Sequence, residues 1–147
     1  MNKGIYLKNR PQGRPELSDF EFKEEQEPKC GSDEISLKTL YVSVDPYLRG
    51  RMRDEKSYIE PFKLDELLES AVVAEVMESK NENFSKGDYV TGMLKWKKQQ
   101  SHSGKGLRKV DKDLAPLSAN LGVLGMTGLT AYFGLLDVGE PKEGETV

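Results

Sequence analysis

Short stretches rich in β-branched and aromatic residues recur along this chain, and they constrain its fold more than any other feature. Turn-forming residues separate stretches of strand length at 4–8, 20–23, 35–44, 71–77 and 89–94. Phe20 and Phe22 alternate with charged residues, as on a sheet that has one face in water. Gly87 follows Lys86 in a tight-turn pattern and is free to take a positive φ. Many short strands with such punctuation predict a β-barrel or a β-sandwich.

The size and charge of the chain exclude several classes of protein. Its 147 residues are enough for one ordinary domain with a real core. A net charge of −3 does not favour broad binding to nucleic acid or to anionic membranes. The sequence has no apolar run of membrane-spanning length, and its N-terminus lacks the apolar core of a signal peptide. We therefore expect a cytoplasmic protein with no nucleic-acid or membrane partner.

The last thirty or so residues differ in character and predict a helix over 127–138. Its apolar positions have the spacing of a buried helix face: Met126, Leu129, Phe133 and Leu136. Thr127 is the expected N-cap, and Gly139 marks the end. The helix is apolar over more than one stripe, so it needs cover on several sides, and we expect it to be partly uncovered in this chain. Residues 145–147 read as the start of a further strand, and the uncovered helix before them favours a second domain over a frayed tail.

A metal site is the first candidate for chemistry, and the sequence argues against it. Cys30-Gly31-Ser32-Asp33 is similar to a run that carries a cysteine ligand in zinc alcohol dehydrogenases. Zinc requires three or four ligands, and His102, the single histidine, has no partner at ligand spacing. A surface thiol in a polar loop is the better interpretation, and we expect no metal.

A basic segment offers a second candidate. Residues 95–98 read Lys-Trp-Lys-Lys, with Lys105, Arg108 and Lys109 further on, a composition that can bind single-stranded nucleic acid. The acidic remainder of the chain favours a mobile, solvated cationic loop instead. The glycines at 122, 125 and 128 do not have the spacing of a dinucleotide-binding turn, and they indicate close backbone packing.

The clearest local signal is Asp45-Pro46, which ends the predicted strand at 35–44. Proline cannot donate to a strand ladder and pushes the residue before it into an extended conformation, so the strand must turn out there. Tyr47 then lies at the mouth of the predicted barrel. Its ring and single hydroxyl suit either the wall of a pocket for apolar carbonyl compounds or a plug for the barrel. Arg49, Arg51 and Arg53 are expected to pair with nearby carboxylates.

Two long motifs give the chain a family resemblance. Residues 40–52, Leu-Tyr-Val-Ser-Val-Asp-Pro-Tyr-Leu-Arg-Gly-Arg-Met, and residues 124–139 closely resemble signatures of zinc-independent medium-chain dehydrogenases/reductases. The similar members are prostaglandin reductases, also called leukotriene hydroxydehydrogenases, and curcumin-reductase-like enzymes. The resemblance covers essentially the whole chain. It implies a mainly β, GroES-like, partly open barrel over residues 1–147 with short helices, whose C-terminal helix leads towards a Rossmann domain that this chain lacks.

The resemblance also implies an activity. Such enzymes are NADP-dependent oxidoreductases that use NADPH to reduce the carbon–carbon double bond of α,β-unsaturated ketones and aldehydes. By the family pattern, the substrate-binding residues are expected to be Tyr47, Tyr58, Met93 and Leu94. Asp45, Met126 and Thr130 match positions near the nicotinamide. The catalytic proton-handling residue belongs to the second domain, so none is expected in this chain. We expect the isolated chain to be inactive and the intact enzyme to be a homodimer.

The chain departs from the family pattern at two places, and the residues alone also allow two other functions. Relatives have a glycine-rich run where this chain has Glu69-Ser70-Ala71, and residues 95–98 are unusually basic, which puts the shape of the substrate wall in question. A stand-alone GroES-like binding or oligomerisation module would need no second domain. An oligonucleotide-binding barrel would bind through residues 95–109 in a salt-sensitive way.

Overall fold

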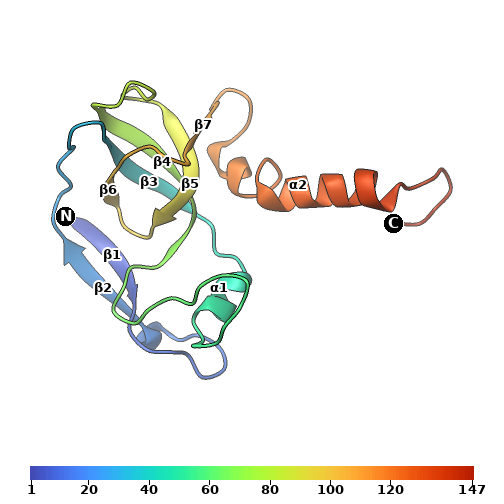
Figure 1. Ribbon diagram of the computed structural model, residues 1–147, viewed down its shortest axis with the longest axis horizontal. Helices are drawn as coiled ribbons and strands as arrows, with labels where there is room; N and C mark the ends of the chain where they lie inside the picture. The colour runs from blue at the N-terminus through green and yellow to red at the C-terminus, as the bar shows by residue number, and fades with distance from the viewer.

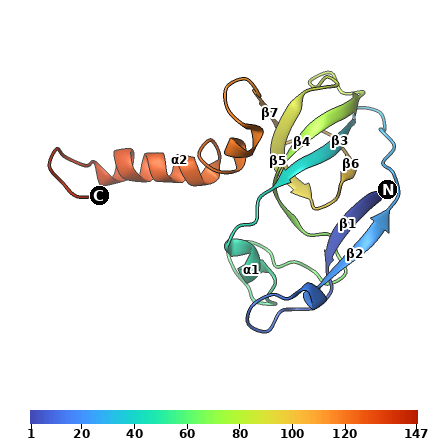
Figure 2. The ribbon, with the colours of Figure 1, turned by 180° about the vertical axis from the view of Figure 1, so that it is seen from behind.

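The computed structural model describes residues 1–147 as two antiparallel sheets followed by a helical C-terminal segment (Figures 1 and 2). One sheet pairs β1 with β2, and the other has the strand order β6-β3-β4-β5-β7. The strands are β1 (Asn2–Leu7), β2 (Phe20–Glu25), β3 (Ile35–Val42), β4 (Glu69–Ser79), β5 (Tyr89–Lys95), β6 (Gln99–His102) and β7 (Arg108–Val110). The sheets do not close into a complete barrel, and the expected mainly β class is confirmed.

The strands that the sequence predicted are all present, and two further strands were missed. β6 has the polar sequence Gln-Gln-Ser-His and β7 has only three residues, so neither carries a strand signal of its own. β6 pairs with β3, and β7 pairs with β5. Their conformation therefore comes from tertiary pairing, which regularly overrides intrinsic strand propensity. The turn before β5 contains Gly87 with a φ of 90°, as expected.

Two apolar clusters form the core. The larger one lies on the five-stranded sheet and consists of Ile35, Leu37, Val72, Ala74, Val76, Val90 and Leu94. The smaller one joins β1 to the short helix α1 (Tyr47–Arg51) and consists of Leu7, Leu48, Met52, Phe62 and Leu68. Tyr47 and Trp96 pack against the smaller cluster, which ties the chain on either side of the Asp45-Pro46 stop to the sheets.

The turn between β5 and β6 links the two sheets, contrary to the mobile loop expected at residues 95–98. The N–H of Ile5 donates to the carbonyl of Trp96 at 2.9 Å, and the N–H of Lys98 donates to the carbonyl of Lys3 at 3.0 Å. The indole Nε1 of Trp96 donates to Ser70 Oγ at 2.8 Å. The basic composition of the segment conceals these contacts, since they depend on the backbone and on the tryptophan.

Cys30 also differs from the expectation of a surface thiol. The residue is buried, and its Sγ donates to the carbonyl of Glu34 at 3.2 Å. His102 lies in β6 instead of a loop. Both residues lie beside the first residue of β3: Cys30 contacts Glu34, and His102 pairs with Ile35. Their surroundings therefore depend on the sheet and not on the polar residues next to them in the sequence.

The C-terminal segment contains η2 (Leu117–Leu121), α2 (Met126–Phe133) and the helical turn η3 (Gly134–Gly139), while η1 (Leu17–Asp19) precedes β2. Figure 1 shows α2 projecting away from both sheets. None of its residues is buried, which confirms the expected lack of cover. The predicted N-cap is wrong: Gly125 occupies that position, and the Thr127 hydroxyl donates to the carbonyl of Gly122 at 3.1 Å.

The close packing expected at the glycines of this segment is present, but the strand expected at 145–147 is not. A Cβ on Gly125 or Gly128 would collide with the backbone of Asn120 or Val123, so close packing is the reason for these glycines. Residues 145–147, expected to start a strand, pair with no strand and follow a turn in which the N–H of Glu145 donates to the carbonyl of Lys142. A strand needs a neighbour for its backbone groups, and no described residues supply one here.

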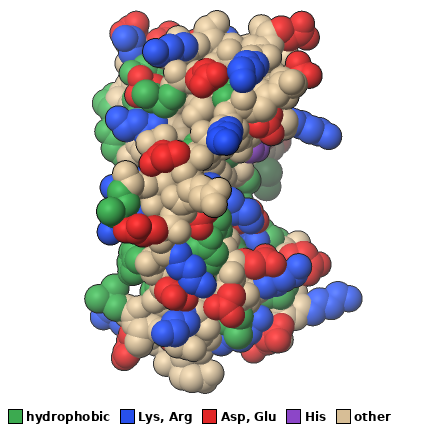
Figure 3. Space-filling view, turned by 90° about the vertical axis from the view of Figure 1, so that its left-hand side faces the viewer, with side chains coloured by type: hydrophobic (Ala, Val, Ile, Leu, Met, Phe, Trp, Pro, Cys, Tyr) green, Lys and Arg blue, Asp and Glu red, His purple; other side chains and the backbone are tan.

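The surface on the side away from α2 mixes both signs of charge. Figure 3 shows basic and acidic side chains interspersed over the two sheets, with hydrophobic side chains visible where the sheets meet. No helix in the chain combines the length and the apolar composition that crossing a membrane requires.

Candidate functional site

The stop after β3 places α1 on the same side of the molecule as α2, opposite the N-terminus (Figures 1 and 2). β3 ends at Val42, and the Ser43 hydroxyl donates to Asp45 Oδ2 at 2.7 Å. The N–H of Leu48 then donates to the carbonyl of Asp45 at 3.1 Å, which closes the first turn of α1. Pro46 has a helical φ of −55° and precedes the first helical residue, where it costs no hydrogen bond.

Tyr47, the first residue of α1, is half-buried against the smaller core cluster. Burial raises the pKa of its phenol, and the negative charge of Asp45 raises that pKa further, while Arg51 opposes the change. Tyr58 and Glu69 make smaller contributions in the same direction as Asp45. The Tyr47 phenol is protonated at neutral pH, as an ordinary tyrosine is, so its hydroxyl can donate a hydrogen bond to a carbonyl oxygen.

Two of the three arginines of this region have different partners from those expected. Arg49 donates to backbone carbonyls, with Nη2 2.7 Å from Gly13 O. Arg51 is buried and pairs with Glu69 at 3.2 Å. Only Arg53 makes an expected pair, a long one of 3.8 Å to Glu55. The expectation of purely local carboxylates is therefore wrong for Arg49 and Arg51, because α1 packs against segments distant in sequence.

An open groove of about 690 Å³ runs between β5 and the C-terminal segment. Met93, Met126 and Thr130, three of the residues singled out by sequence, lie along it. Leu129 and Phe133 add apolar surface, whereas Arg108 and Asn120 add polar groups. The hydroxyl of Thr130 donates to the carbonyl of Met126 at 2.7 Å, so towards a ligand this hydroxyl is free only to accept.

The strand β4 connects the groove to the surroundings of Tyr47. Ala71 lines the groove and pairs with Met93 of β5. Glu69, two residues earlier, lies opposite Lys95 in the same strand pair, and its negative charge raises the pKa of Tyr47. Residues two apart on a strand share one face, about 7 Å apart along it. On one face of β4, Ala71 therefore lines the groove while Glu69 contacts Arg51 of α1.

The remaining candidates lie in different surroundings. Leu94 is 3% exposed and belongs to the larger core cluster, because side chains alternate along β5 and Met93 takes the outward position. Of that pair, Met93 alone stays a candidate for contact with a substrate. Tyr58 is largely exposed. Asp45 lines a separate small hollow of about 240 Å³ that also includes Pro46 and Trp96.

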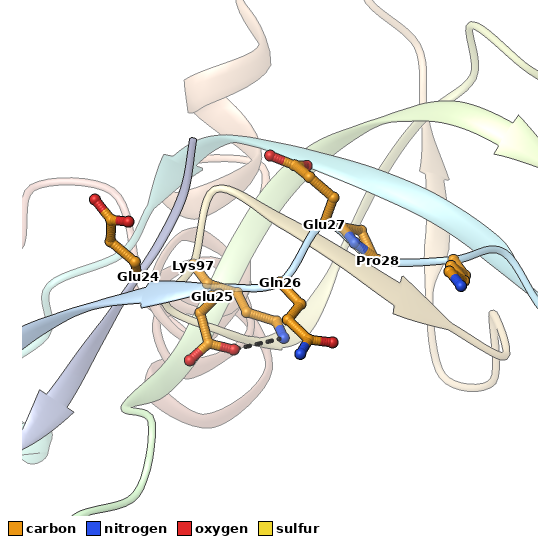
Figure 4. A pocket seen from close by; sticks show the side chains of 7 residues that line it. Glu24, Glu25, Gln26, Glu27, Pro28 and Lys97 are labelled. Atoms are coloured by element: carbon orange, nitrogen blue, oxygen red, sulfur yellow. Dashed lines mark ion pairs between the residues drawn. The ribbon is translucent and has the colours of Figure 1, made fainter.

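A further hollow of about 630 Å³ contains none of these residues. It is lined by residues 24–29 and Lys97, all of them polar or charged apart from Pro28 (Figure 4). Lys97 lies 3.6 Å from Glu25 across it. No cluster of three or more His, Cys, Asp or Glu side chains in the structure is arranged to hold a metal ion.

Sequence reasoning missed two groups in this region. The first is the buried Arg51 with Glu69, and the second is Ser70, whose hydroxyl donates to the carbonyl of Ser43 at 2.7 Å and accepts from Trp96. A signal for the first was present: Leu48, Arg51 and Met52 share a helix face by their spacing of three and four. An arginine between two core positions is unusual enough to expect a buried acidic partner.

The sequence matches a family described as the N-terminal domain of oxidoreductase over residues 3–110. This match covers more than half of the chain, so the chain belongs to that family. The resemblance derived from residues 40–52 and 124–139 is thereby confirmed, since similar proteins include curcumin, alkenal and prostaglandin reductases.

Individual relatives agree with this assignment. A Bacillus subtilis protein, YfmJ, whose assignment as an NADP-dependent oxidoreductase is provisional, is 57% identical over 97% of this chain. The NADPH-dependent curcumin reductase of Escherichia coli is 41% identical over 99% of it. The solved structure of CurA from Vibrio vulnificus has a TM-score of 0.89, with 41% identity over 99% of this chain. This chain spans 42% of the length of each of the two sequence relatives and 43% of the CurA chain.

Proposed function

We propose that this chain is the substrate-side domain of an NADPH-dependent reductase that acts on the carbon–carbon double bond of α,β-unsaturated ketones and aldehydes. The observation that carries the proposal is the groove along β5 and α2, which gathers Met93, Met126 and Thr130 beside an apolar surface. Similar proteins are named for NADPH-dependent curcumin reduction and for NADP-dependent 2-alkenal reduction, and CurA has been solved with NADPH.

In this proposal Tyr47 and Tyr58 form one wall of the substrate site and Met93 another. NADPH supplies a hydride for the β-carbon of the substrate, and negative charge then develops on the carbonyl oxygen. A protonated phenol aimed at that oxygen stabilises the charge where it develops. The place of Tyr47 as the first residue of α1, half-buried against the smaller core cluster, supports this role because it fixes where the phenol lies. Leu94 contributes from the core by fixing β5 beneath Met93.

The proposed cofactor contacts are Asp45, Met126 and Thr130. The hydroxyl of Thr130 already donates within α2, so it offers only lone pairs, which suit an amide N–H such as that of the nicotinamide carboxamide. Met126 presents an exposed, polarisable side chain at the start of α2. Asp45 is fixed by Ser43 next to Tyr47. Zinc has no part in this scheme.

The rest of the proposed enzyme is a nucleotide-binding domain that follows residue 147 and covers α2. The exposed apolar side chains of α2 support this arrangement, as does the greater length of the relatives. The proton-handling group and most of the cofactor site belong to that domain. We propose a cytoplasmic homodimer for the complete protein, with residues 1–147 as one GroES-like unit.

The central experiment compares the complete protein with this chain alone. NADPH oxidation, followed at 340 nm with an enone such as 3-nonen-2-one, is expected for the complete protein and not for residues 1–147. A complete protein that oxidises no NADPH with any enone or enal contradicts the proposal. A reading frame that ends at residue 147 supports the stand-alone module instead.

The role of Tyr47 has a sharper test. Tyr47→Phe in the complete protein removes one hydrogen bond to a charged oxygen, so kcat/KM for the enone is expected to fall about 10- to 100-fold. Tyr41→Phe is the matched control, since Tyr41 is an exposed tyrosine of β3 outside the proposed site. Equal kinetics for the two variants contradict a substrate role for Tyr47.

A further inference from the structure

Arg51 is the only charged residue that is buried in this chain, with a side chain that is 7% exposed. Burying a charge is costly unless it is paired and hydrogen-bonded. Its Nη1 is buried with no hydrogen-bond partner. Apolar side chains of similar volume often serve stability equally well or better than a buried ion pair. The arginine therefore calls for an explanation other than stability alone.

The first set of contacts holds the loop that carries Tyr58. Arg51 Nε donates to the carbonyl of Glu60 at 2.9 Å. The guanidinium carbon lies 3.9 Å from the ring centroid of Phe62, and the N–H of Phe62 donates to the carbonyl of Arg51 at 2.7 Å. One residue thus fixes the path of residues 60–62 through its side chain and its backbone together.

The second set of contacts reaches the large sheet. Arg51 Nη2 lies 3.2 Å from Glu69 Oε1, and the other oxygen of Glu69 lies 2.8 Å from Lys95 Nζ. Burial opposes ionisation of Glu69, but the hydrogen bonds from Lys95 and Arg51 outweigh it and lower its pKa. The carboxylate is therefore charged at neutral pH. It connects α1 to β4 and β5, the strands that carry Ala71 and Met93.

We propose that Arg51 is the positioning residue of the substrate wall, because its guanidinium fixes α1, the Tyr58 loop and the β4–β5 pair relative to one another. This inference rests on the proposed function, since the wall is the one that Tyr47 and Tyr58 form there. Tyr47 lies four residues before Arg51 on α1, hence on the same helix face. A planar guanidinium with several donors can hold these segments at once, and a lysine ammonium cannot reproduce that geometry.

The test is Arg51→Lys in the complete protein, with Arg53→Lys as the matched control. Arg53 lies two residues further along, is exposed, and makes only a long pair with Glu55. The readouts are amide hydrogen exchange over residues 58–62 and the separate values of KM and kcat for an enone with NADPH. For Arg51→Lys we expect exchange and KM each to rise about 10-fold, the effect of roughly one lost hydrogen bond, with kcat changed much less. Arg53→Lys is expected to change neither.

Each outcome decides something. Unchanged exchange or unchanged KM in Arg51→Lys, with an active wild-type protein, overturns the positioning role. A wild-type protein inactive towards every enone overturns the proposed function and the substrate wall with it, and exchange then still reports whether Arg51 holds the loop. If Arg51→Lys folds poorly, Phe62→Leu removes the ring beneath the guanidinium and keeps an apolar side chain in the smaller core cluster. It is expected to give the same two increases at about threefold, since a cation–π contact is weaker than the hydrogen bonds, and no increase overturns the proposal.

Discussion

The sheets and the C-terminal helix both carry many apolar side chains but use them in opposite ways. In the sheets, residues such as Leu37 and Val72 are fully buried in the larger core cluster. In α2, Leu129 and Phe133 are about half exposed, at 53% and 50%. Apolar surface that stays in water contributes nothing to folding, so the stability of this chain comes almost entirely from residues 2–110. The matched family region, 3–110, coincides with that part.

The largest expected effect comes from truncating one leucine in each region. Leu37→Ala removes a buried side chain and leaves a cavity, so it should lower the free energy of unfolding by about 2–5 kcal/mol. Leu129→Ala in this chain should change it by less than about 0.5 kcal/mol, because the position is exposed and alanine favours a helix. Urea unfolding followed by tryptophan fluorescence measures both.

The same pair sharpens the comparison in the complete protein. If a second domain covers α2, Leu129→Ala should there cost about 2 kcal/mol, since burial of the other half of the side chain is lost. A cost as small as in this chain would contradict the proposed cover. Equal costs for Leu37→Ala and Leu129→Ala in residues 1–147 would show that α2 is already packed, contrary to the structure.

An intermediate effect is expected where the two sheets meet. Ser70→Ala removes the acceptor of Trp96 Nε1 and the donor to the carbonyl of Ser43. Both groups would stay in the interior without a partner, which should cost about 1.5 kcal/mol. The exposed Ser32→Ala is the control. A cost no greater than that of the control would mean that the polar contact does not contribute to joining the sheets.

The sequence was sufficient for features that depend on local pattern. The strand at 35–44, the turn at Gly87 and the helix after residue 126 follow from periodicity and turn residues, and the motif around Asp45-Pro46-Tyr47 identified the family. The strand β6 could not be predicted, because a Gln-Gln-Ser-His segment becomes a strand only beside β3. The lysines around Trp96 likewise predicted a solvated segment, whereas its indole donates a hydrogen bond to Ser70, a contact that only the fold creates.

In the candidate site, too, some residues were predictable from the sequence and others depend on tertiary contacts. Sequence resemblance selected Met93, Met126 and Thr130, and the groove contains all three. It also selected Leu94, whose inward direction depends on the register of β5 against β4. The burial of Arg51 was not predicted because its partners, Glu60 and Glu69, are distant enough in the chain that only the fold brings them together.

The smallest expected effect concerns pH and the single histidine. Burial lowers the pKa of His102 from 6.5, although Glu34 opposes the change, and its Nδ1 accepts the N–H of Gly104 at 2.9 Å. The unfolded chain therefore binds this proton more tightly than the folded one, so stability should fall as the pH decreases below about 6.5. The lowered pKa values of Glu34, Glu69 and Asp88 affect stability only at more acidic pH, since carboxyl groups ionise near 4.

His102→Asn isolates this contribution, because the asparagine Oδ1 can accept the same N–H without taking up a proton. Between pH 7 and pH 5 the urea midpoint of the wild-type chain should decrease, and that of the variant should stay nearly level. Equal slopes for the two proteins would mean that His102 titrates as it does in the unfolded chain. The β3–β6 edge would then be open to water, and the contrast between a closed sheet region and an exposed helix would be weaker than the structure indicates.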